Sequence, residues 1–346
     1  MPKALYVHAA RDLRLGACDV SEPQAGEVLV TLARGGICGS DLSYFKNGGF
    51  GTVRIREPMV LGHEVAGHVA AVGEGVDHLA VGDLVAISPS RPCGGCVECH
   101  RGNPNHCMNM RFYGSAMPFP HIQGAFRDQI IADAKNCVLA TGLSAAEAAM
   151  AEPLAVVLHA VKQAGIMMGT RVLVTGCGPI GVLTILAARR AGAAEIIATD
   201  IADNVLEFAK SAGADVVLNT ATDPEALAAY AVGKGTLDIH FECSGAQTAL
   251  AGGIAALRPK GRIVQLGLSG DMSLPMMQVT AKELSITGSF RFHEEFATAV
   301  RLMQSGLIDV KPLVTHSYAL DDFQAAFEMA LDRSQSMKVQ LEFAPC

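Results

Sequence analysis

Four cysteines close together in the chain have the spacing of a metal site. They are Cys93, Cys96, Cys99 and Cys107. Four thiolates at these intervals can surround one tetrahedral ion, as in structural zinc sites. Because four protein ligands leave no open position, such an ion would hold a loop in place and take no part in chemistry. His100 and His106 lie close enough in the sequence to compete as ligands.

A second motif is typical of dinucleotide binding. It reads Gly176-Cys177-Gly178-Pro179-Ile180-Gly181. It directly follows the apolar run 172–174 and opens a predicted helix. In that context the three glycines permit a tight turn, close approach of a pyrophosphate and close packing of helix on strand. The helix N-terminus supplies amide donors and the positive end of the helix dipole to the phosphates.

The motif also requires an acidic residue about 20 positions further on, at the end of the next strand. Asp200 stands there, directly after the strand-like run 196–199. A carboxylate pairs with the ribose hydroxyls and repels a 2′-phosphate. Residues 201–208 contain no lysine or arginine that could bind such a phosphate. The sequence therefore predicts NAD in preference to NADP.

A third set of residues is scattered through the first half of the chain. It consists of Cys38, His63, Glu64 and Glu152. Taken singly, each has a structural explanation, such as a buried thiol for Cys38 and a helix end before Pro153 for Glu152. Taken together, a thiolate, an imidazole and two carboxylates suit a catalytic zinc that keeps one coordination position open.

The order and spacing of these motifs resemble those of the zinc-dependent medium-chain dehydrogenases over nearly the whole chain. Glu152-Pro153, where many alcohol dehydrogenases carry a cysteine, indicates the sorbitol dehydrogenase-like polyol branch. The segments 111–117, 119–121 and 288–292 are similar to the members of that branch that act on sugar acids. The resemblance implies one catalytic and one structural zinc ion, and a nicotinamide dinucleotide.

The resemblance also implies roles for single residues. The direct ligands of the catalytic zinc would be Cys38, His63 and Glu64. Glu152 would hold the zinc-bound water or join these ligands as the site opens, and Ser40 and Tyr44 would face the reacting hydroxyl. The family often has a histidine of a proton relay where this chain has Ser43, so the exit route of the proton stays open. The residues implied beside the nicotinamide include Cys243 and Leu266.

A sugar acid needs a cationic partner for its carboxylate. Because the net charge of the chain is −7, a local arginine must provide it, and a guanidinium can form two parallel hydrogen bonds to a carboxylate. Arg291 is the first candidate and Arg111 the second, although either could simply extend to the surface. The resemblance implies oxidation of a secondary hydroxyl, L-idonate to 5-keto-D-gluconate, with NAD. Two alternatives are a dehydrogenase of polyols such as sorbitol or xylitol, and a dinucleotide-binding protein without turnover.

The predicted secondary structure that must position these residues changes near residue 155. Before it, short β-rich runs alternate with glycines and prolines, which is typical of an irregular β domain. After it, strands alternate with helices, and six strands are predicted at 171–175, 195–199, 215–218, 237–242, 261–266 and 284–289. This alternation predicts an α/β protein with a doubly wound parallel sheet.

Two domains follow from this change. Residues 1–155 together with 295–346 are expected to form the β-rich catalytic domain that binds zinc, GroES-like by resemblance. Residues 156–294 are expected to form the dinucleotide-binding Rossmann domain. A last strand at 338–343 is expected to return to the sheet of the first domain, and Asp203 is expected to cap the helix that ends near Ala212.

Composition and charge exclude several classes of protein. The chain has 346 residues, of which 50% are hydrophobic and 18% charged, so it can bury a large core and is not intrinsically disordered. Its net negative charge provides no large positive field for nucleic acid or an anionic membrane. The ten cysteines, with no apolar signal segment at the N-terminus, predict a cytoplasmic protein. The resemblance implies a homodimer or homotetramer joined through edge strands of the cofactor domains.

Overall fold

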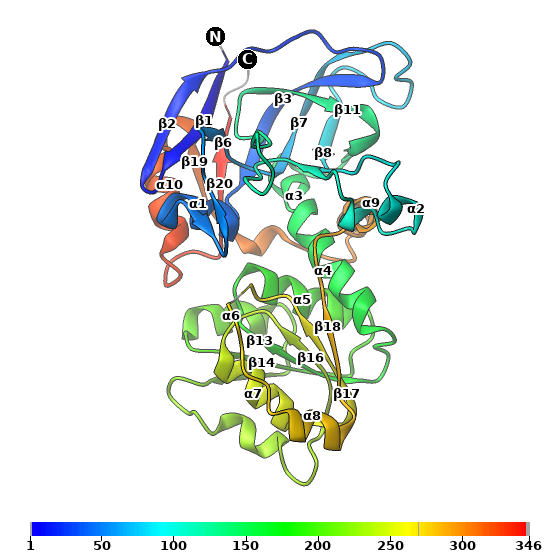
Figure 1. Cartoon of the computed structure of the whole chain (residues 1–346), viewed down its shortest axis with the longest axis vertical. Helices are drawn as coiled ribbons and strands as arrows, with labels where there is room; N and C mark the ends of the chain where they lie inside the picture. Colours follow the sequence, from blue (N-terminus) through cyan, green and yellow to red (C-terminus); the bar gives the residue numbers. More distant parts are fainter. Residues whose placement is uncertain (1, 269, 344–346) are drawn as a thin grey trace. The chain divides into compact units, whose positions relative to one another are not determined.

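The computed structural model describes residues 2–268 and 270–343. The chain forms two compact units (Figure 1). The first comprises Met1–Glu152, Phe292–Asp332 and Lys338–Cys346, and the second comprises Pro153–Arg291 and Arg333–Met337. The boundaries predicted from the sequence, 155/156 and 294/295, lie three residues from these. The prediction also placed residues 333–337, which belong to the second unit, in the first domain.

A seven-stranded sheet forms the centre of the first unit. Its strands are β3 (Glu27–Gly36), β7 (Glu64–Val72), β8 (Leu84–Ile87), β11 (Gln129–Asp133), β12 (Cys137–Leu139), β19 (Val314–Ala319) and β20 (Lys338–Glu342). Their order is β12-β8-β7-β3-β20-β19, and β11 pairs with β3 outside that path. Because β20 pairs antiparallel with β3, the C-terminal strand returns to the N-terminal sheet, as the sequence predicted.

Smaller elements complete the first unit. Three strands form a sheet in the order β2 (Asp12–Ala17), β1 (Lys3–Ala9), β6 (Met59–Val60). Two short ribbons pair β4 (Gly49–Phe50) with β5 (Val53–Arg54) and β9 (Ser90–Arg91) with β10 (Arg111–Phe112). The helices are α1 (Gly39–Asn47), α2 (Val97–His100), α3 (Ala145–Ala149), α9 (Glu295–Gln304) and α10 (Phe323–Leu331), with 3-10 turns at Pro104–His106, Ala134–Asn136, Lys311–Leu313 and Leu320–Asp322. Helix α4 (Ala151–Ala164) begins in the first unit and continues into the second.

The second unit is built on a parallel sheet of six strands. They are β13 (Arg171–Thr175), β14 (Glu195–Asp200), β15 (Val216–Asn219), β16 (Leu237–Glu242), β17 (Leu257–Gln265) and β18 (Ser285–Gly288). The order β15-β14-β13-β16-β17-β18, with every neighbouring pair parallel, confirms the predicted doubly wound sheet. The chain reverses its direction of winding between β13 and β16, which is where such folds bind their ligands.

Four helices of the second unit pack against this sheet. They are α5 (Pro179–Arg190), α6 (Asp203–Ser211), α7 (Gln247–Ala256) and α8 (Met276–Lys282), with a 3-10 turn at Ala226–Tyr230. Helices α5 and α6 pack on β13–β15, α7 packs on β13, β16 and β17, and α8 packs on β17 (Figure 1). The N-cap of α6 is Ala202 and not the predicted Asp203. The Asp203 carboxylate accepts a hydrogen bond from Asn219 Nδ2 at 2.6 Å. Within residues 2–268 and 270–343, no helix combines the length and the apolar character needed to cross a membrane.

Candidate active site

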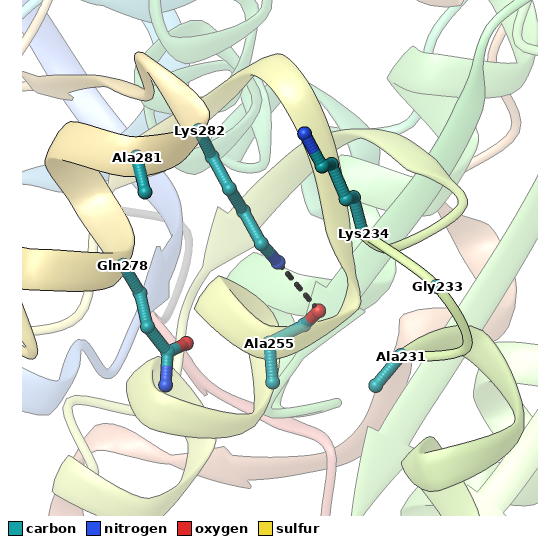
Figure 2. A pocket seen from close by; sticks show the side chains of 7 residues that line it. All are labelled: Ala231, Gly233, Lys234, Ala255, Gln278, Ala281 and Lys282. Carbon is teal, nitrogen blue, oxygen red and sulfur yellow. Dashed lines mark hydrogen bonds between the residues drawn. The ribbon is translucent and has the colours of Figure 1, made fainter.

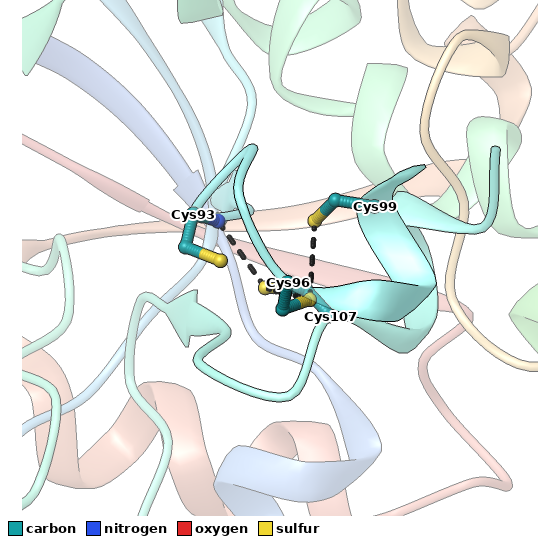
Figure 3. Close-up of side chains that lie close together, drawn as sticks. All are labelled: Cys93, Cys96, Cys99 and Cys107. Carbon is teal, nitrogen blue, oxygen red and sulfur yellow. Dashed lines mark hydrogen bonds between the residues drawn. The ribbon is translucent and has the colours of Figure 1, made fainter. Parts of the chain in front are cut away.

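The four cysteines of the 93–107 loop converge in the first unit (Figure 3). Their sulfurs all lie within 4.8 Å of one another. Cys96 Sγ is 3.5 Å from Cys99 Sγ and 3.8 Å from Cys107 Sγ. A tetrahedral zinc with bonds of about 2.3 Å would hold its sulfurs about 3.8 Å apart, so the loop folds to the spacing that zinc requires. His100 and His106 are not members of the group.

Backbone amides of the same loop point at these sulfurs. Cys93 N donates to Cys107 Sγ at 3.2 Å, and Met108 N donates to Cys96 Sγ at 3.4 Å. The amides of Cys99 and Met108 lower the pKa of Cys96 to about 6. Hydrogen bonds from the loop thus favour the thiolate, the form that zinc binds, at Cys93 and Cys96, whereas burial raises the pKa of Cys99 to about 12.

A second group of metal-ligating side chains lies at the ends of β3 and β7. Its members are Cys38, His63 and Glu64, whose ligand atoms lie within 4.8 Å of one another. Cys38 follows β3 as the N-cap of α1, while Glu64 begins β7 and His63 precedes it. The antiparallel pairing of β3 with β7, in which Gly36 is opposite Glu64, brings the two sequence segments together.

Asp41, to which the sequence analysis assigned no role, accepts hydrogen bonds from the backbone beside Cys38 and His63. It is fully buried, and its two oxygens accept from Cys38 N at 3.0 Å and Gly62 N at 3.2 Å. His63 Nδ1 lies 3.9 Å from Asp41 Oδ1 and has no hydrogen-bond partner among the described residues. At 3.9 Å the carboxylate faces Nδ1 without a hydrogen bond; a movement that closed this gap would orient the ring and leave Nε2 for a metal. The signal in the sequence was an acid three positions after Cys38, which can bond back to the N-cap amide.

Lys338 is a second residue that the sequence reading missed. Its Nζ donates to both oxygens of Glu64, at 2.8 and 2.7 Å, and the two side chains are only 4% and 1% exposed. Burial lowers the pKa of Lys338, but Glu64 and Cys38 raise it more, so it lies above its ordinary value. Glu64 therefore faces a permanent cation, and no local pattern links two residues 274 positions apart.

Glu152 lies near this group but outside it. It stands in the first turn of α4 and is buried. Burial raises its pKa to about 8, with His63 acting in the opposite direction and Glu64 adding to the rise. Burial likewise raises the pKa of the Cys38 thiol to about 12. A cation bound among these groups would favour their charged forms, and a soft thiolate with an imidazole and a carboxylate is a donor set that fits zinc.

The residues predicted to face the substrate hydroxyl lie on α1. Ser40 is half-buried in its first turn. Tyr44 is almost fully buried, and its hydroxyl accepts from Ala116 N at 3.0 Å. Ser43 donates to the carbonyl of Gly39 at 2.9 Å, so its hydroxyl is engaged within the helix.

The two candidate arginines belong to different units. Arg111 is exposed on β10 of the first unit. Arg291 follows β18 in the second unit, has a φ of +56°, and places its guanidinium 4.8 Å from the ring centre of Phe290. Whether either binds a substrate carboxylate stays a prediction.

The glycine motif and Asp200 meet at the carboxyl edge of the parallel sheet. Gly176 leaves β13 with a φ of +84°, and Gly178 is the N-cap of α5, whose first turn contains Pro179 and Ile180. Asp200 ends β14, and its Oδ2 accepts from Cys177 N, inside the motif, at 2.7 Å. The sequence pattern and the fold thus place the acid directly against the glycine loop.

The loops after β16 and β17 lie at the same edge. Cys243 N donates to Thr175 O at 2.9 Å, and Leu266 N donates to Glu242 O at 2.8 Å. Cys243 Sγ is 3.7 Å from Thr184 Oγ1, and burial raises the pKa of this thiol to about 12. The two residues predicted beside the nicotinamide therefore border the point at which the strand order reverses.

Arg333 adds a positive charge that the sequence reading did not assign to this edge. A Cβ on Gly178 would lie 3.1 Å from Arg333 Nη2, and the Arg333 carbonyl accepts from Asn204 Nδ2 at 2.7 Å. The guanidinium thus stands at the start of α5, where a helix N-terminus already favours phosphate.

A cavity of about 350 Å³ lies elsewhere in the second unit (Figure 2). It is lined by Ala231, Gly233, Lys234, Ala255, Gln278, Ala281 and Lys282. Lys282 Nζ donates to the carbonyls of Ile254, Ala255 and Leu257 at 2.9, 2.8 and 2.8 Å. This lysine satisfies carbonyls at the C-terminal end of α7, and none of the predicted site residues lines the cavity.

Comparisons with known proteins agree with this arrangement. The protein-family model of the alcohol dehydrogenase GroES-like domain matches residues 24–142, and the family model of the zinc-binding dehydrogenases matches residues 179–305. The chain is 43% identical to L-idonate 5-dehydrogenase (NAD(P)(+)) of Escherichia coli over 317 residues, 91% of each chain. It belongs to the zinc-binding dehydrogenase family.

Further relatives place the dehydrogenase in the sorbitol dehydrogenase-like branch, as its sequence indicated. It is 35% identical to human sorbitol dehydrogenase over 347 residues, 99% of this chain and 96% of that protein. The crystal structure of L-idonate 5-dehydrogenase from Escherichia coli superposes with a TM-score of 0.95 at 40% identity, covering 99% of this chain and 98% of the other. The predicted family, fold class and pair of zinc sites are thereby confirmed.

Proposed function

We propose that this dehydrogenase oxidises the secondary hydroxyl at carbon five of L-idonate to give 5-keto-D-gluconate, with NAD as the hydride acceptor. The observation that carries the proposal is the identity of 43% to an L-idonate 5-dehydrogenase, against 35% to human sorbitol dehydrogenase. The group of Cys38, His63 and Glu64, in which His63 and Glu64 are buried, supplies the chemistry that such an oxidation needs.

The chain's own residues have distinct parts in this reaction. When bound, zinc and the dinucleotide supply a Lewis acid and a hydride acceptor. Cys38, His63 and Glu64 hold the metal, and Asp41 faces Nδ1 of the His63 imidazole. Glu152, buried in the first turn of α4 near this group, would hold water beside the metal or join its ligands.

Recognition of the hydroxyl and the carboxylate falls to other side chains. Ser40 and Tyr44 face the hydroxyl, and no relay role is assigned to Ser43, whose hydroxyl donates to Gly39 O. We assign the substrate carboxylate to Arg291 first and to Arg111 second. Arg291→Ala should raise KM for L-idonate much more than KM for sorbitol, and equal increases for both substrates would remove the assignment.

The first experiment measures initial rates of NAD reduction with L-idonate, D-gluconate, sorbitol and xylitol, each with and without a zinc chelator. A preference for L-idonate that the chelator abolishes supports the proposal. A preference for neutral polyols would favour the second candidate, a polyol dehydrogenase, which the similarity to sorbitol dehydrogenases over 99% of the chain also supports. Membership of an enzyme family excludes the third interpretation, a dinucleotide-binding protein without turnover.

The cofactor and the assembly state are part of the proposal. Asp200 favours NAD, and a kcat/KM for NADP above that for NAD would contradict this choice. We propose a homodimer or homotetramer joined through the edge of β18, the last strand of its sheet, where Ile286 is 41% exposed. Light scattering on the purified protein measures the mass directly, and a monomer would refute this assembly.

A further inference from the structure

Glu242 occupies the point at which the winding of the parallel sheet reverses. It is the last residue of β16 and is fully buried. Thr175 ends the neighbouring β13 opposite it, and Gln265 ends β17 on its other side. The carboxyl ends of three strands therefore surround one carboxylate, at the place where doubly wound folds bind their ligands.

The carboxylate bonds to residues of all three strand ends. Oε1 accepts from Ser244 N at 2.9 Å, from Gly245 N at 3.1 Å and from Thr175 Oγ1 at 3.3 Å, and also from Ser244 Oγ. Oε2 accepts from Gly245 N at 3.0 Å and from Gln265 Nε2 at 2.6 Å. Each of these donors is a neutral group, so the charge of Glu242 is stabilised by oriented dipoles and by no lysine or arginine in the described part of the chain.

The loops that leave these strands pack against one another without room for side chains. A Cβ on Gly176, in the dinucleotide motif, would lie 2.7 Å from Ser244 N. A Cβ on Gly267, after β17, would lie 2.6 Å from Glu242 Oε2. Because real Cβ atoms do not approach so closely, the loop after β17 has no free space beside the Glu242 carboxylate, and a shift of that carboxylate would displace this loop.

We propose that Glu242 is a positioning residue that holds the loops after β16 and β17 in the form that binds the nicotinamide half of the dinucleotide. A doubly wound sheet consists of two mononucleotide-binding halves, and most bonds of Glu242 go to the half built from β16–β18. The adenosine half, with Asp200 and the glycine motif, has its own support in the bond from Cys177 N to Asp200. The proposal rests on dinucleotide binding alone and not on the identity of the substrate.

The chain offers a matched control at the opposite edge of the same strands. Asp238, near the start of β16, accepts from Arg171 N of β13 at 2.7 Å and forms an ion pair with Arg258 of β17. Like Glu242, it connects β13, β16 and β17, but it lies at their amino ends. Asp238→Asn and Glu242→Gln thus each remove one carboxylate charge that connects the same three strands, at opposite edges of the sheet.

The experiment measures equilibrium binding of NADH and of ADP-ribose, which lacks the nicotinamide, together with thermal unfolding of each zinc-loaded variant. We expect Glu242→Gln to weaken NADH binding about tenfold, the scale of losing a charge-assisted hydrogen bond, and to leave ADP-ribose binding unchanged. Asp238→Asn should lower the melting temperature and change neither dissociation constant. Gln265→Leu, which removes one donor to Glu242, should act in the same direction as Glu242→Gln with a smaller effect.

Two results would overturn the proposal. Equal weakening of NADH and ADP-ribose by Glu242→Gln would show a general loosening of the unit, and unchanged NADH binding would show that the carboxylate has no role in it. If Glu242→Gln does not fold, Gln265→Leu decides between the same outcomes. Failure of the L-idonate assignment would leave these binding constants as they are, because no sugar acid is present in the assay.

Discussion

Replacement of Lys338 by methionine tests the electrostatics of the candidate zinc site. The change keeps most of the side-chain volume and removes the cation that donates to both oxygens of Glu64 at 2.8 and 2.7 Å. The carboxylate would then be buried beside Cys38 and Glu152 without the ammonium that balances its charge. The pair is 4% and 1% exposed, so solvent cannot replace the lost partner.

The expected loss follows from this burial. Removing one partner of a buried ion pair costs about 3–5 kcal/mol. In a domain of 150–250 residues each kcal/mol corresponds to about 2–4 °C, so the melting temperature of the metal-free protein should fall by about 6–20 °C. Bound zinc gives Glu64 a second cation, so the zinc-loaded variant should lose less. By linkage, Lys338→Met should bind zinc more tightly than the natural protein does.

The assay is calorimetry of both proteins with zinc and with a chelator, together with a zinc titration. Lys338→Arg keeps the positive charge and serves as the control, with a smaller loss expected in both states. An equal fall of the melting temperature with and without zinc would refute the reasoning, because it would mean that Glu64 does not face the bound metal.

Four further predictions concern other parts of the molecule. Gly253→Ala should lower the melting temperature, because its Cβ would overlap the buried ring of His240. Gly252→Ala on the same helix is the control: its Cβ would lie 3.2 Å from a leucine methyl, and it should raise the melting temperature because alanine has a higher helix propensity by about 1 kcal/mol. Burial lowers the pKa of His240 to about 4, so between roughly pH 6.5 and pH 4 the unfolded chain takes up a proton that the folded chain does not. The free energy of unfolding should therefore fall by up to about 3 kcal/mol over this range. His240→Gln should reduce this pH dependence in chemical unfolding. Cys107→Ser should reduce the zinc content measured by elemental analysis from two ions to one. Arg333→Ala should weaken NADH binding several-fold in fluorescence titrations, and unchanged affinity would show that its guanidinium does not reach the phosphates.

Short-range patterns explain why so much could be predicted from the sequence. The four cysteines of the structural site lie within one loop, and the glycine motif follows its own strand, so neighbouring residues alone determine their geometry. The six strands of the parallel sheet are apolar runs bounded by helices, and periodicity is sufficient to find them. The Cys38, His63 and Glu64 group is spread more widely, and its prediction depended on the resemblance to a family as well as on residue type.

Other parts of the site depended on contacts that no sequence window contains. Lys338 faces Glu64 only because β20 pairs with β3, and the alternation of side chains along a strand does not tell which partner lies beside it. For Glu242 the sequence left two alternatives, a position beside the nicotinamide implied by the resemblance and a purely structural role, because its hydrogen bonds come from the ends of three strands that only the fold brings together. The sequence determined the residue types, the four-cysteine zinc motif, the glycine motif and the strand–helix alternation, because these are local. Only the tertiary structure decided which buried charges meet, because long-range strand pairing places them.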